Sequence, residues 1–424
     1  MKIGVITWGS EGDVRPFMAL AGGLVRAGHA VDFVYTSVEG RDWRAAVAGM
    51  GCRVTALGEA HVARARTGAE RALREAVLKA DPIKQVQVVS EQLLEPMVEE
   101  LWAESVRLVR DNDVVVAHFL VHPAITAAAK VQRPVVPVFT APVLPTRAFP
   151  PLGMPDLGFL NGVGWWASAK LANRLFTGPI NALRRREGVP LLTNVYDDHA
   201  TPMPVILVTV SPTLVPRPAD WPPEVDVCGF LNAPAALHPE PLPDGLDAFI
   251  SAGPPPVYLT LGSMMLVGDE EPAVATRFLL DAASRSGARA ILQAPWDTLP
   301  AMDVPADVFK VTRADHARVF PGCAAVVHHG GAGTTQAACV AGVPSVLVPY
   351  IADQFFWATA LRKRGVAPAA VPRRKIRADT LAARIREAVQ DAGMRTRARA
   401  VGEAMRAEDG VARAVERLGA LEKH

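Results

Sequence analysis

Short apolar runs alternate with apolar residues at helical spacing along most of the chain. Residues 2–8 form an apolar, β-branched run typical of a buried strand, and the polar segment 9–13 indicates a turn. Apolar residues then recur at helical spacing from Phe17 to Leu24, and a second apolar run covers 31–37. This order of strand, helix and strand predicts an α/β fold built on a parallel sheet.

The same alternation returns in the second half of the chain, after a segment rich in proline. Eleven of the 36 prolines fall between residues 216 and 256, which favours an extended connection over a helix or a central strand. Since 424 residues exceed one ordinary core, we expect two domains. The expected division is an N-terminal domain over 1–225, a linker over 226–256 and a C-terminal domain over 257–424.

Composition and charge exclude several classes of protein. Hydrophobic residues make up 50% of the chain and charged residues 21%, as in a packed globular protein. The net charge of +2 provides no general attraction for nucleic acid. Four separated cysteines without a CxxC pair argue against a zinc site or a disulfide framework, and favour a cytoplasmic location. No apolar run is long enough to predict a transmembrane segment.

The segment HHGGAGTT at 328–335 follows an apolar strand and opens a predicted helix over about 333–341. Glycines permit close backbone approach, a helix N-terminus presents N–H groups, and His329 and Thr334 add side-chain donors. These features suit a phosphate or diphosphate. The alternative is a tight strand-to-helix turn with threonine as the N-cap. The chain has neither a GxxxxGK[ST] loop nor a GxGxxG fingerprint, and Ser263 lacks the GxSxG context of a hydrolase nucleophile.

Acidic residues follow two of the predicted strands. Asp13 ends the first loop, at the edge where open α/β sheets bind ligands, and is a candidate general base. Its alternative role is the N-cap of the next helix, with Pro16 in the first turn. Asp353 and Gln354 follow the strand 345–350 and offer a carboxylate and an amide to a polyol, with helix capping as the alternative.

Two further groups have weaker chemical signals. His118 and His122 form an HxxxH pair, but no intervening glutamate or third ligand supports a metal site. Trp165 and Trp166, with Phe149 nearby in sequence, line an apolar acceptor pocket or pack a lid.

Six segments in order resemble nucleotide-sugar glycosyltransferases of the GT-B fold, in particular sterol glucosyltransferases and bacterial natural-product glycosyltransferases. The likeness covers nearly the whole chain. The segments are GSEGDVRP at 9–16, PVLPTRAFP at 142–150, SPTLVPRPADWP at 211–222, PVYLTLGSM at 256–264, HHGGAGTT at 328–335 and ADQFFWA at 352–358. The first loop departs from the family pattern at Glu11, where relatives often carry arginine.

The resemblance implies two Rossmann-like domains with a cleft between them, the acceptor mainly on the first and the nucleotide-sugar donor mainly on the second. It implies that Asp13 is the catalytic base, with His118, Phe149, Trp165 and Trp166 as candidates for the acceptor pocket. The residues that it implies for donor binding are Ser10, Ser263, His316, His329, Ala332, Gly333, Thr334, Asp353 and Gln354.

The expected activity is inverting transfer of a hexose to a hydroxyl of an apolar acceptor such as a sterol, macrolide, polyketide or phenolic compound. The resemblance favours UDP-glucose as the donor, with a dTDP-deoxysugar as the alternative and a catalytically silent nucleotide-binding protein as a more remote one. No cofactor and no metal ion are expected, because the hydrogen-bond donors of the second domain neutralise the leaving diphosphate.

Overall fold

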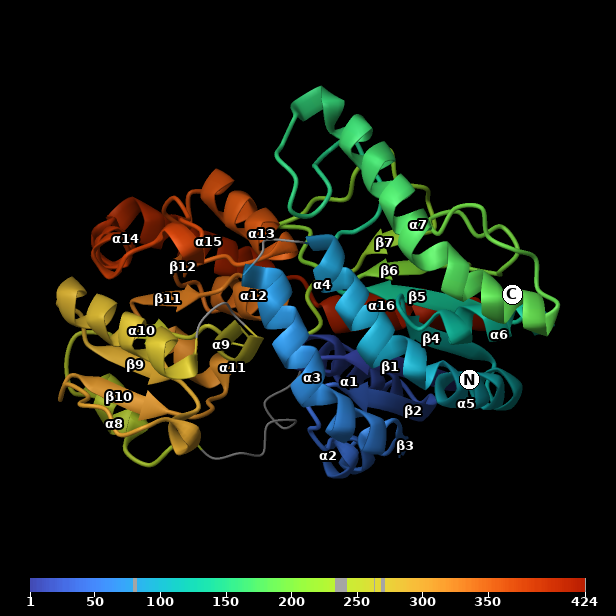
Figure 1. Cartoon of the computed structure of the whole chain (residues 1–424), viewed down its shortest axis with the longest axis horizontal. Helices are drawn as coiled ribbons and strands as arrows, with labels where there is room; N and C mark the ends of the chain where they lie inside the picture. Colours follow the sequence, from blue (N-terminus) through green and yellow to red (C-terminus); the bar gives the residue numbers. More distant parts are fainter. Residues whose placement is uncertain (79–81, 233–241, 263, 268–270, 424) are drawn as a thin grey trace. The chain divides into compact units, whose positions relative to one another are not determined.

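The computed structural model describes residues 1–78, 82–232, 242–262, 264–267 and 271–423 (Figure 1). They form two compact units, each with its own parallel sheet. This confirms the expected class of two parallel-sheet α/β domains. The first unit consists of Met1–Ala69, Ile83–Ala233 and Asp409–His424, and the second of Glu70–Pro82 and Pro234–Glu408.

The first unit is built on a seven-stranded sheet in the order β3-β2-β1-β4-β5-β6-β7, counted over the described residues. Its strands are β1 (Lys2–Gly9), β2 (Ala30–Ser37), β3 (Arg53–Ala56), β4 (Val114–His118), β5 (Val135–Phe139), β6 (Ile206–Val208) and β7 (Val225–Val227). Its helices are α1 (Glu11–Arg26), α2 (Arg44–Gly49), α4 (Pro82–Val88), α5 (Val98–Asp111), α6 (His122–Val131), α7 (Asn161–Glu187) and α16 (Gly410–Gly419), while α3 (Glu59–Leu78) begins in it.

Burial on both faces explains why the central strands are almost continuously apolar. Ile3, Val5 and Ile6 of β1 are fully buried although successive side chains point to opposite faces of the sheet. β1 pairs in parallel with β2 on one side and β4 on the other. The buried residues of α1, among them Phe17 and Leu20, supply the apolar stripe that the helical spacing predicted.

The second unit has a five-stranded parallel sheet in the order β10-β9-β8-β11-β12, again over the described residues. Its strands are β8 (Val257–Leu259), β9 (Ala290–Gln293), β10 (Val308–Val311), β11 (Ala325–His328) and β12 (Ser345–Leu347). Its helices are α8 (Leu246–Ser251), α9 (Met264–Val267), α10 (Pro272–Ser286), α11 (His316–Val319), α12 (Ala332–Val340), α13 (Ala352–Lys363), α14 (Ala378–Gln390) and α15 (Ala392–Arg406).

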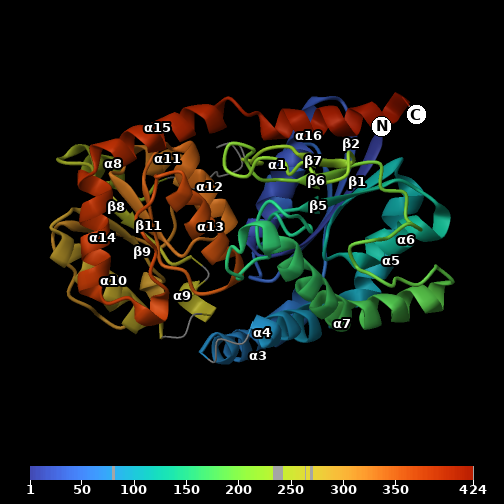
Figure 2. The same ribbon diagram turned by 90° about the horizontal axis from the view of Figure 1, so that it is seen from above.

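The C-terminal helix α16 belongs to the first unit, whereas the sequence division assigned all of 257–424 to the second domain. It packs against α1 (Figure 2), where a Cβ at Gly23 would lie 2.4 Å from Val411. Arg413 of α16 also forms an ion pair with Asp226 of β7, at 3.0 Å between Nη2 and Oδ2. These contacts lie far apart in the sequence, so local patterns did not reveal them.

Several elements differ from the sequence expectation. The charged stretch over about 62–110 is predicted to be helical from its sequence, but in the structure it is divided by a π-helical turn (Val89–Leu94) and a 3₁₀ turn (Glu95–Met97) that contains Pro96. The 27-residue helix α7 was not predicted. The proline-rich segment includes the short strand β7 and helix α8.

None of the helices in the described ranges combines the length and apolar character needed to cross a membrane.

Candidate functional site

Each sheet reverses its strand order at one point. The chain runs from β1 outward through β2 to β3 and resumes with β4 on the other side of β1, and β8 to β11 repeat this pattern. Open α/β sheets bind ligands beside the carboxyl ends of the two strands at such a point. Asp13 follows β1 and His118 ends β4, while His329 follows β11. The strongest sequence candidates therefore lie at the two switch points.

Asp13 is held at the start of α1 by its own loop. The backbone N–H and the hydroxyl of Ser10 both donate to Asp13 Oδ2, each at 2.9 Å. A Cβ at Gly9, whose φ is +143°, would lie 2.4 Å from that oxygen, so only glycine permits this approach. The N-cap of α1 is Ser10 rather than Asp13, and Pro16 is the sixth helical residue, one turn later than expected.

His118 is the second group on the Asp13 carboxylate. Its Nε2 lies 3.4 Å from Asp13 Oδ1, and its Nδ1 accepts the backbone N–H of Leu120 at 3.4 Å. An acceptor at Nδ1 leaves the proton on Nε2, pointing at Asp13. The imidazole is 1% exposed and packs against Phe17 and Phe119, whereas the Asp13 side chain is 28% exposed. Of the two, Asp13 is the group that a ligand can reach.

The environment of Asp13 keeps its carboxylate ionised. Burial raises the pKa of Asp13, but the contact with His118 and the hydrogen bonds from Ser10 outweigh this effect, so the pKa lies below its usual value. Oδ2 carries both short Ser10 bonds, whereas the contacts of Oδ1 with His118 and Thr140 are each 3.4 Å long. Oδ1 is therefore the less strongly held oxygen.

Glu11, which departs from the family pattern, has its charge balanced within the first unit. Arg41 Nη1 donates to Glu11 Oε1 at 2.5 Å, and Arg15 Nη1 lies 3.7 Å from Oε2. The guanidinium of Arg41 also lies over the ring of Trp43, 4.1 Å from its centroid. The acidic side chain therefore belongs to an ordered ion-pair network beside Asp13.

The phosphate-binding candidate has the expected form of a helix N-terminus. The N-cap of α12 is Gly331, which has no side chain with which to cap the helix, so the alternative of a threonine N-cap is wrong. The first backbone hydrogen bond of the helix runs from Thr335 N to Gly331 O. The N–H groups of Ala332, Gly333 and Thr334 precede it and are oriented for an anion.

Two glycines from different loops enclose the imidazole of His329. A Cβ at Gly262 would lie 2.6 Å from His329 Cε1, and a Cβ at Gly331 would lie 2.4 Å from Nε2. His329 is 7% exposed, and its Nδ1 has no hydrogen-bond partner among the described residues. Burial lowers the pKa of His329 to about 4, so the ring is neutral near pH 7. The imidazole is thus buried and neutral, and the two glycines fix the space that it occupies.

The other donor-site candidates lie at the start of neighbouring helices. Gln354 is 3% exposed, and its Oε1 accepts the backbone N–H groups of Tyr350 and Ile351 at 2.7 and 3.2 Å, so its carbonyl does cap α13. Asp353 lies in the first turn of the same helix. His316 opens α11 and stacks on Phe320. Ser263 lies outside the described residues.

Comparison with known proteins identifies the family. Residues 277–421 match the family described as erythromycin biosynthesis protein CIII-like, C-terminal domain. The chain is 34% identical to O-mycaminosyltylonolide 6-deoxyallosyltransferase of Streptomyces fradiae, over 97% of this chain and 95% of that one. The chain belongs to this family of glycosyltransferases.

Two further comparisons agree with this assignment. Sterol 3-beta-glucosyltransferase UGT80B1 of Arabidopsis thaliana is 30% identical over 98% of this chain and 67% of its own length. The crystal structure of the glycosyltransferase VinC in complex with dTDP covers both chains completely, with a TM-score of 0.69 and 19% identity. The chain therefore has the GT-B fold.

The aromatic candidates of the glycosyltransferase divide into an inner and an outer group. Trp165 is 4% exposed and its indole N–H donates to Phe149 O at 2.9 Å. Phe149 in turn packs edge-on against Trp221. Trp166 is 60% exposed and lies beside Lys170. Contact of these rings with an acceptor stays a prediction.

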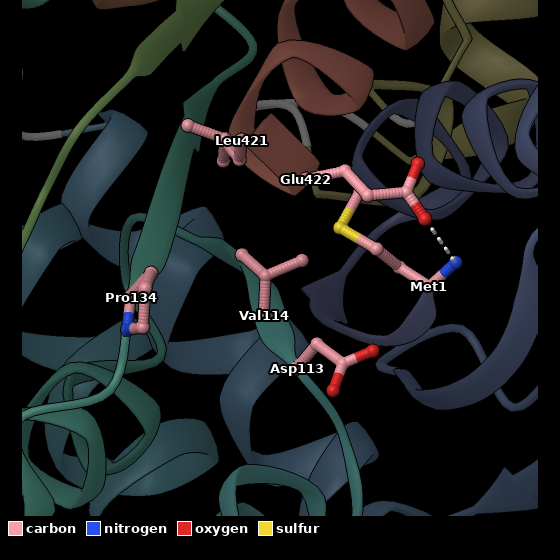
Figure 3. Close-up of a pocket in the computed structure, with 6 residues that line it drawn as sticks. All are labelled: Met1, Asp113, Val114, Pro134, Leu421 and Glu422. Atoms are coloured by element: carbon pink, nitrogen blue, oxygen red, sulfur yellow. Dashed lines mark hydrogen bonds and ion pairs between the residues drawn. The ribbon is translucent and has the colours of Figure 1, made fainter. Parts of the chain in front are cut away.

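Two cavities lie at opposite ends of the strands of the first sheet. The cavity in Figure 3, of about 290 Å³, is at the amino ends of the strands and is lined by Met1, Asp113, Val114, Pro134, Leu421 and Glu422. Since Asp13 follows the carboxyl end of β1, this cavity is not its site. A second cavity, of about 330 Å³, is lined at the carboxyl ends of β2 and β3 by Ser37, Arg41, Leu57 and Val62 among others. Through Arg41 it adjoins Glu11 and the Asp13 loop.

Three features of these sites were not predicted from the sequence. His118 was expected in the acceptor pocket, which stays a prediction, but its contact with Asp13 was not anticipated. Thr140 and Gly262 were not singled out. The signal for His118 is its place near the end of the apolar run at 113–119, which is typical of a buried strand, since the carboxyl ends of parallel strands meet at one side of a sheet. Among the described residues, no three His, Cys, Asp or Glu side chains gather as a metal ion requires.

Proposed function

We propose that this glycosyltransferase moves a hexose from a nucleoside diphosphate sugar to a hydroxyl of an apolar small molecule, with inversion at the anomeric carbon. The observation that carries the proposal is the N-terminus of α12, where backbone N–H groups and the enclosed imidazole of His329 form a cradle for a diphosphate. Asp13, ionised and partly exposed, supplies the base on the other sheet.

In the proposed reaction the acceptor oxygen attacks the anomeric carbon while the bond from that carbon to the diphosphate oxygen breaks. The hydroxyl proton passes to Asp13 Oδ1, the oxygen without short hydrogen bonds. His118 orients the carboxylate through Nε2 and stabilises its charge. The departing diphosphate carries the electron pair, and the α12 N–H groups, Thr334 and His329 stabilise its negative charge.

The donor has two candidates. The sterol 3-beta-glucosyltransferase supports glucose, and with it UDP-glucose as the donor. The Streptomyces fradiae relative transfers a 6-deoxyallosyl group, and VinC was crystallised with dTDP, which supports a dTDP-deoxysugar. We propose that Asp353 and Gln354 contact the sugar, His316 the nucleobase, and Ser10 and Ser263 further parts of the donor.

The cavity beside the Asp13 loop supports an acceptor site on the first unit. Leu57 and Val62 give it an apolar wall, and Ser37 and Arg41 add polar groups. This mixture fits an apolar scaffold with hydroxyl groups. We extend the acceptor proposal to Phe149 and Trp165, which lie on the same unit.

Product analysis tests the proposed function. The purified protein is incubated with UDP-glucose or a dTDP-deoxyhexose and a panel of macrolide, sterol and phenolic acceptors. We expect one acceptor class to gain the mass of one sugar, with release of an equal amount of nucleoside diphosphate. Consumption of donor without a glycosylated acceptor contradicts the proposal, as does nucleotide-sugar binding with no turnover across the panel.

A further inference from the structure

Exposed apolar side chains concentrate on one segment of the first unit. Of the thirteen large hydrophobic side chains that are exposed in the described part of the chain, seven fall between residues 154 and 171. Single exposed hydrophobic residues are ordinary, but a contiguous group marks an interaction surface. We call this group the apolar tip; its members are Met154, Leu157, Phe159, Leu160, Val163, Trp166 and Leu171.

Hydrogen bonds of neighbouring residues order the segment that carries the apolar tip. Asn161 Oδ1 accepts the backbone N–H of Leu157 at 2.9 Å, and its Nδ2 donates to Asp156 Oδ1 at 3.0 Å. The neighbouring Trp165 is buried and bonded to Phe149. Exposed Phe159 and Trp166 are therefore presented by an ordered turn and helix rather than left over from loose packing. In Figure 1 the amino-terminal part of α7 extends beyond the strands of its unit.

Charge is graded along the same face of α7. Val163, Trp166, Lys170 and Arg174 are spaced by three, four and four residues, so they lie on one stripe that is apolar at its start and basic further on. Lys170 Nζ lies 3.8 Å from the Trp166 ring centroid. Asp156 is the only acidic residue between 154 and 175, and its Oδ1 accepts the N–H groups of Gly158 and Asn161.

We propose that the apolar tip binds the surface of a lipid bilayer that contains anionic lipids. Phenylalanine, leucine and tryptophan followed by exposed lysine and arginine are the residues that insert at the boundary of head groups and acyl chains. A protein partner fits less well, since a stable protein interface takes about 20–30 residues from each side. Binding by the apolar tip determines where in the cell the enzyme works. This proposal does not depend on the glycosyl transfer proposed above.

Co-sedimentation with vesicles tests this proposal. We expect the protein to pellet with phosphatidylcholine vesicles that contain phosphatidylglycerol, more weakly with phosphatidylcholine alone, and less at high salt. The double variant Phe159→Glu/Trp166→Glu should lower the partition coefficient at least about tenfold, because it places two charges in the apolar region. The double variant Lys170→Glu/Arg174→Glu should lose the preference for anionic vesicles.

The control is Val274→Glu, which places a charge on an exposed apolar residue of the second unit. It should pellet like the wild type, and all variants should keep the wild-type circular dichroism spectrum. Wild-type protein that stays in the supernatant with both vesicle types overturns the proposal, as does equal partition of wild type and Phe159→Glu/Trp166→Glu. Self-association in sedimentation velocity that this double variant abolishes also overturns it, and makes the tip an interface between copies.

Discussion

At the scale of single residues, the two members of the Asp13–His118 pair have different roles because their exposure differs. Both sit at the switch point of the first sheet, but His118 is enclosed by aromatic rings and directs Nε2 at the carboxylate, while part of Asp13 remains exposed. A buried imidazole with its second nitrogen occupied by Leu120 N–H cannot accept the acceptor's proton. The pair therefore acts as a base and its positioning group.

Asp13→Asn removes the proposed base while keeping the shape of the side chain. Since general-base catalysis contributes about 10²- to 10⁴-fold in rate, we expect kcat to fall by that factor with donor affinity unchanged. The matched control is Asp113→Asn at the opposite edge of the same sheet, where the carboxylate accepts Lys2 N–H at 2.8 Å. Near wild-type turnover in the Asp13 variant rules out this residue as the base.

His118→Phe tests the positioning role through the pH profile. The contact with His118 helps to hold the Asp13 pKa down against the effect of burial, so its removal raises that pKa. The carboxylate then becomes protonated at higher pH, and the acidic limb of kcat/KM against pH moves upward. His199→Gln, at an exposed position, is the control and should leave that limb in place. An acidic limb that does not move in His118→Phe contradicts the role.

At the scale of elements, the N-terminus of α12 depends on glycines for two different reasons. Gly331 lacks room for a Cβ because His329 lies 2.4 Å away, whereas a Cβ at Gly333 meets no atom within 4 Å. Gly331 is thus required by packing against His329. In our account Gly333 is required by the ligand, because a diphosphate on the α12 N–H groups occupies the space outside it.

The variants Gly331→Ala and Gly333→Ala separate these reasons. We expect Gly331→Ala to displace His329 and to lower both stability and nucleotide affinity. Gly333→Ala should keep stability or raise it by up to about 1 kcal/mol, since alanine favours a helix, while nucleotide affinity still falls. Thermal melting with and without nucleoside diphosphate measures both. Unchanged nucleotide affinity in Gly333→Ala means that the diphosphate does not lie on this turn.

Elements also show what the sequence could and could not reveal. The apolar run 2–8 and the glycine-rich turn at 328–335 predicted a strand and a helix N-terminus because their patterns are local. The contact of His118 with Asp13 depends on β4 lying beside β1, which follows from strand order rather than from either segment. Helix α7 was not predicted because Val163 and Trp166, which are apolar but exposed, interrupt the helical spacing of its buried apolar residues.

At the scale of the whole molecule, the two units repeat one arrangement, a parallel sheet whose strand order reverses at one point. In each unit the candidate functional side chains lie at that point. The sequence indicated both α/β halves, because buried parallel strands read as apolar runs. It did not indicate that residues 409–424 return to the first unit, since Arg413 and Asp226 are distant in sequence.

Buried histidines in both units make stability depend on pH. Burial lowers the pKa of His122 and His329 to about 4 and that of His328 to about 3. The unfolded chain binds protons at these groups below about pH 6.5, before the folded protein does, so the free energy of unfolding falls as pH drops from 6.5 towards 4. Each contributes up to about 1.4 kcal/mol per pH unit across that window.

His122→Leu isolates one of these contributions. Neither ring nitrogen of His122 has a hydrogen-bond partner among the described residues, so leucine removes the protonation penalty without breaking such a bond. Relative to wild type, the variant should gain about 2 kcal/mol between pH 7.5 and pH 5. Urea unfolding at the two pH values measures this, and a difference between variant and wild type that does not change with pH contradicts the buried, neutral state.

The central claim is that separate residues perform the two tasks. His329 and the N-terminus of α12 bind the nucleoside diphosphate, whereas Asp13, positioned by His118, abstracts the proton. Calorimetric titration of wild type, Asp13→Asn and His329→Ala with UDP and dTDP tests it most directly. We predict binding of one nucleotide by the wild type, the same affinity in Asp13→Asn, and at least about tenfold weaker binding in His329→Ala, equivalent to 1.4 kcal/mol. Equal affinity in His329→Ala and wild type, or no binding of either nucleotide, contradicts the claim.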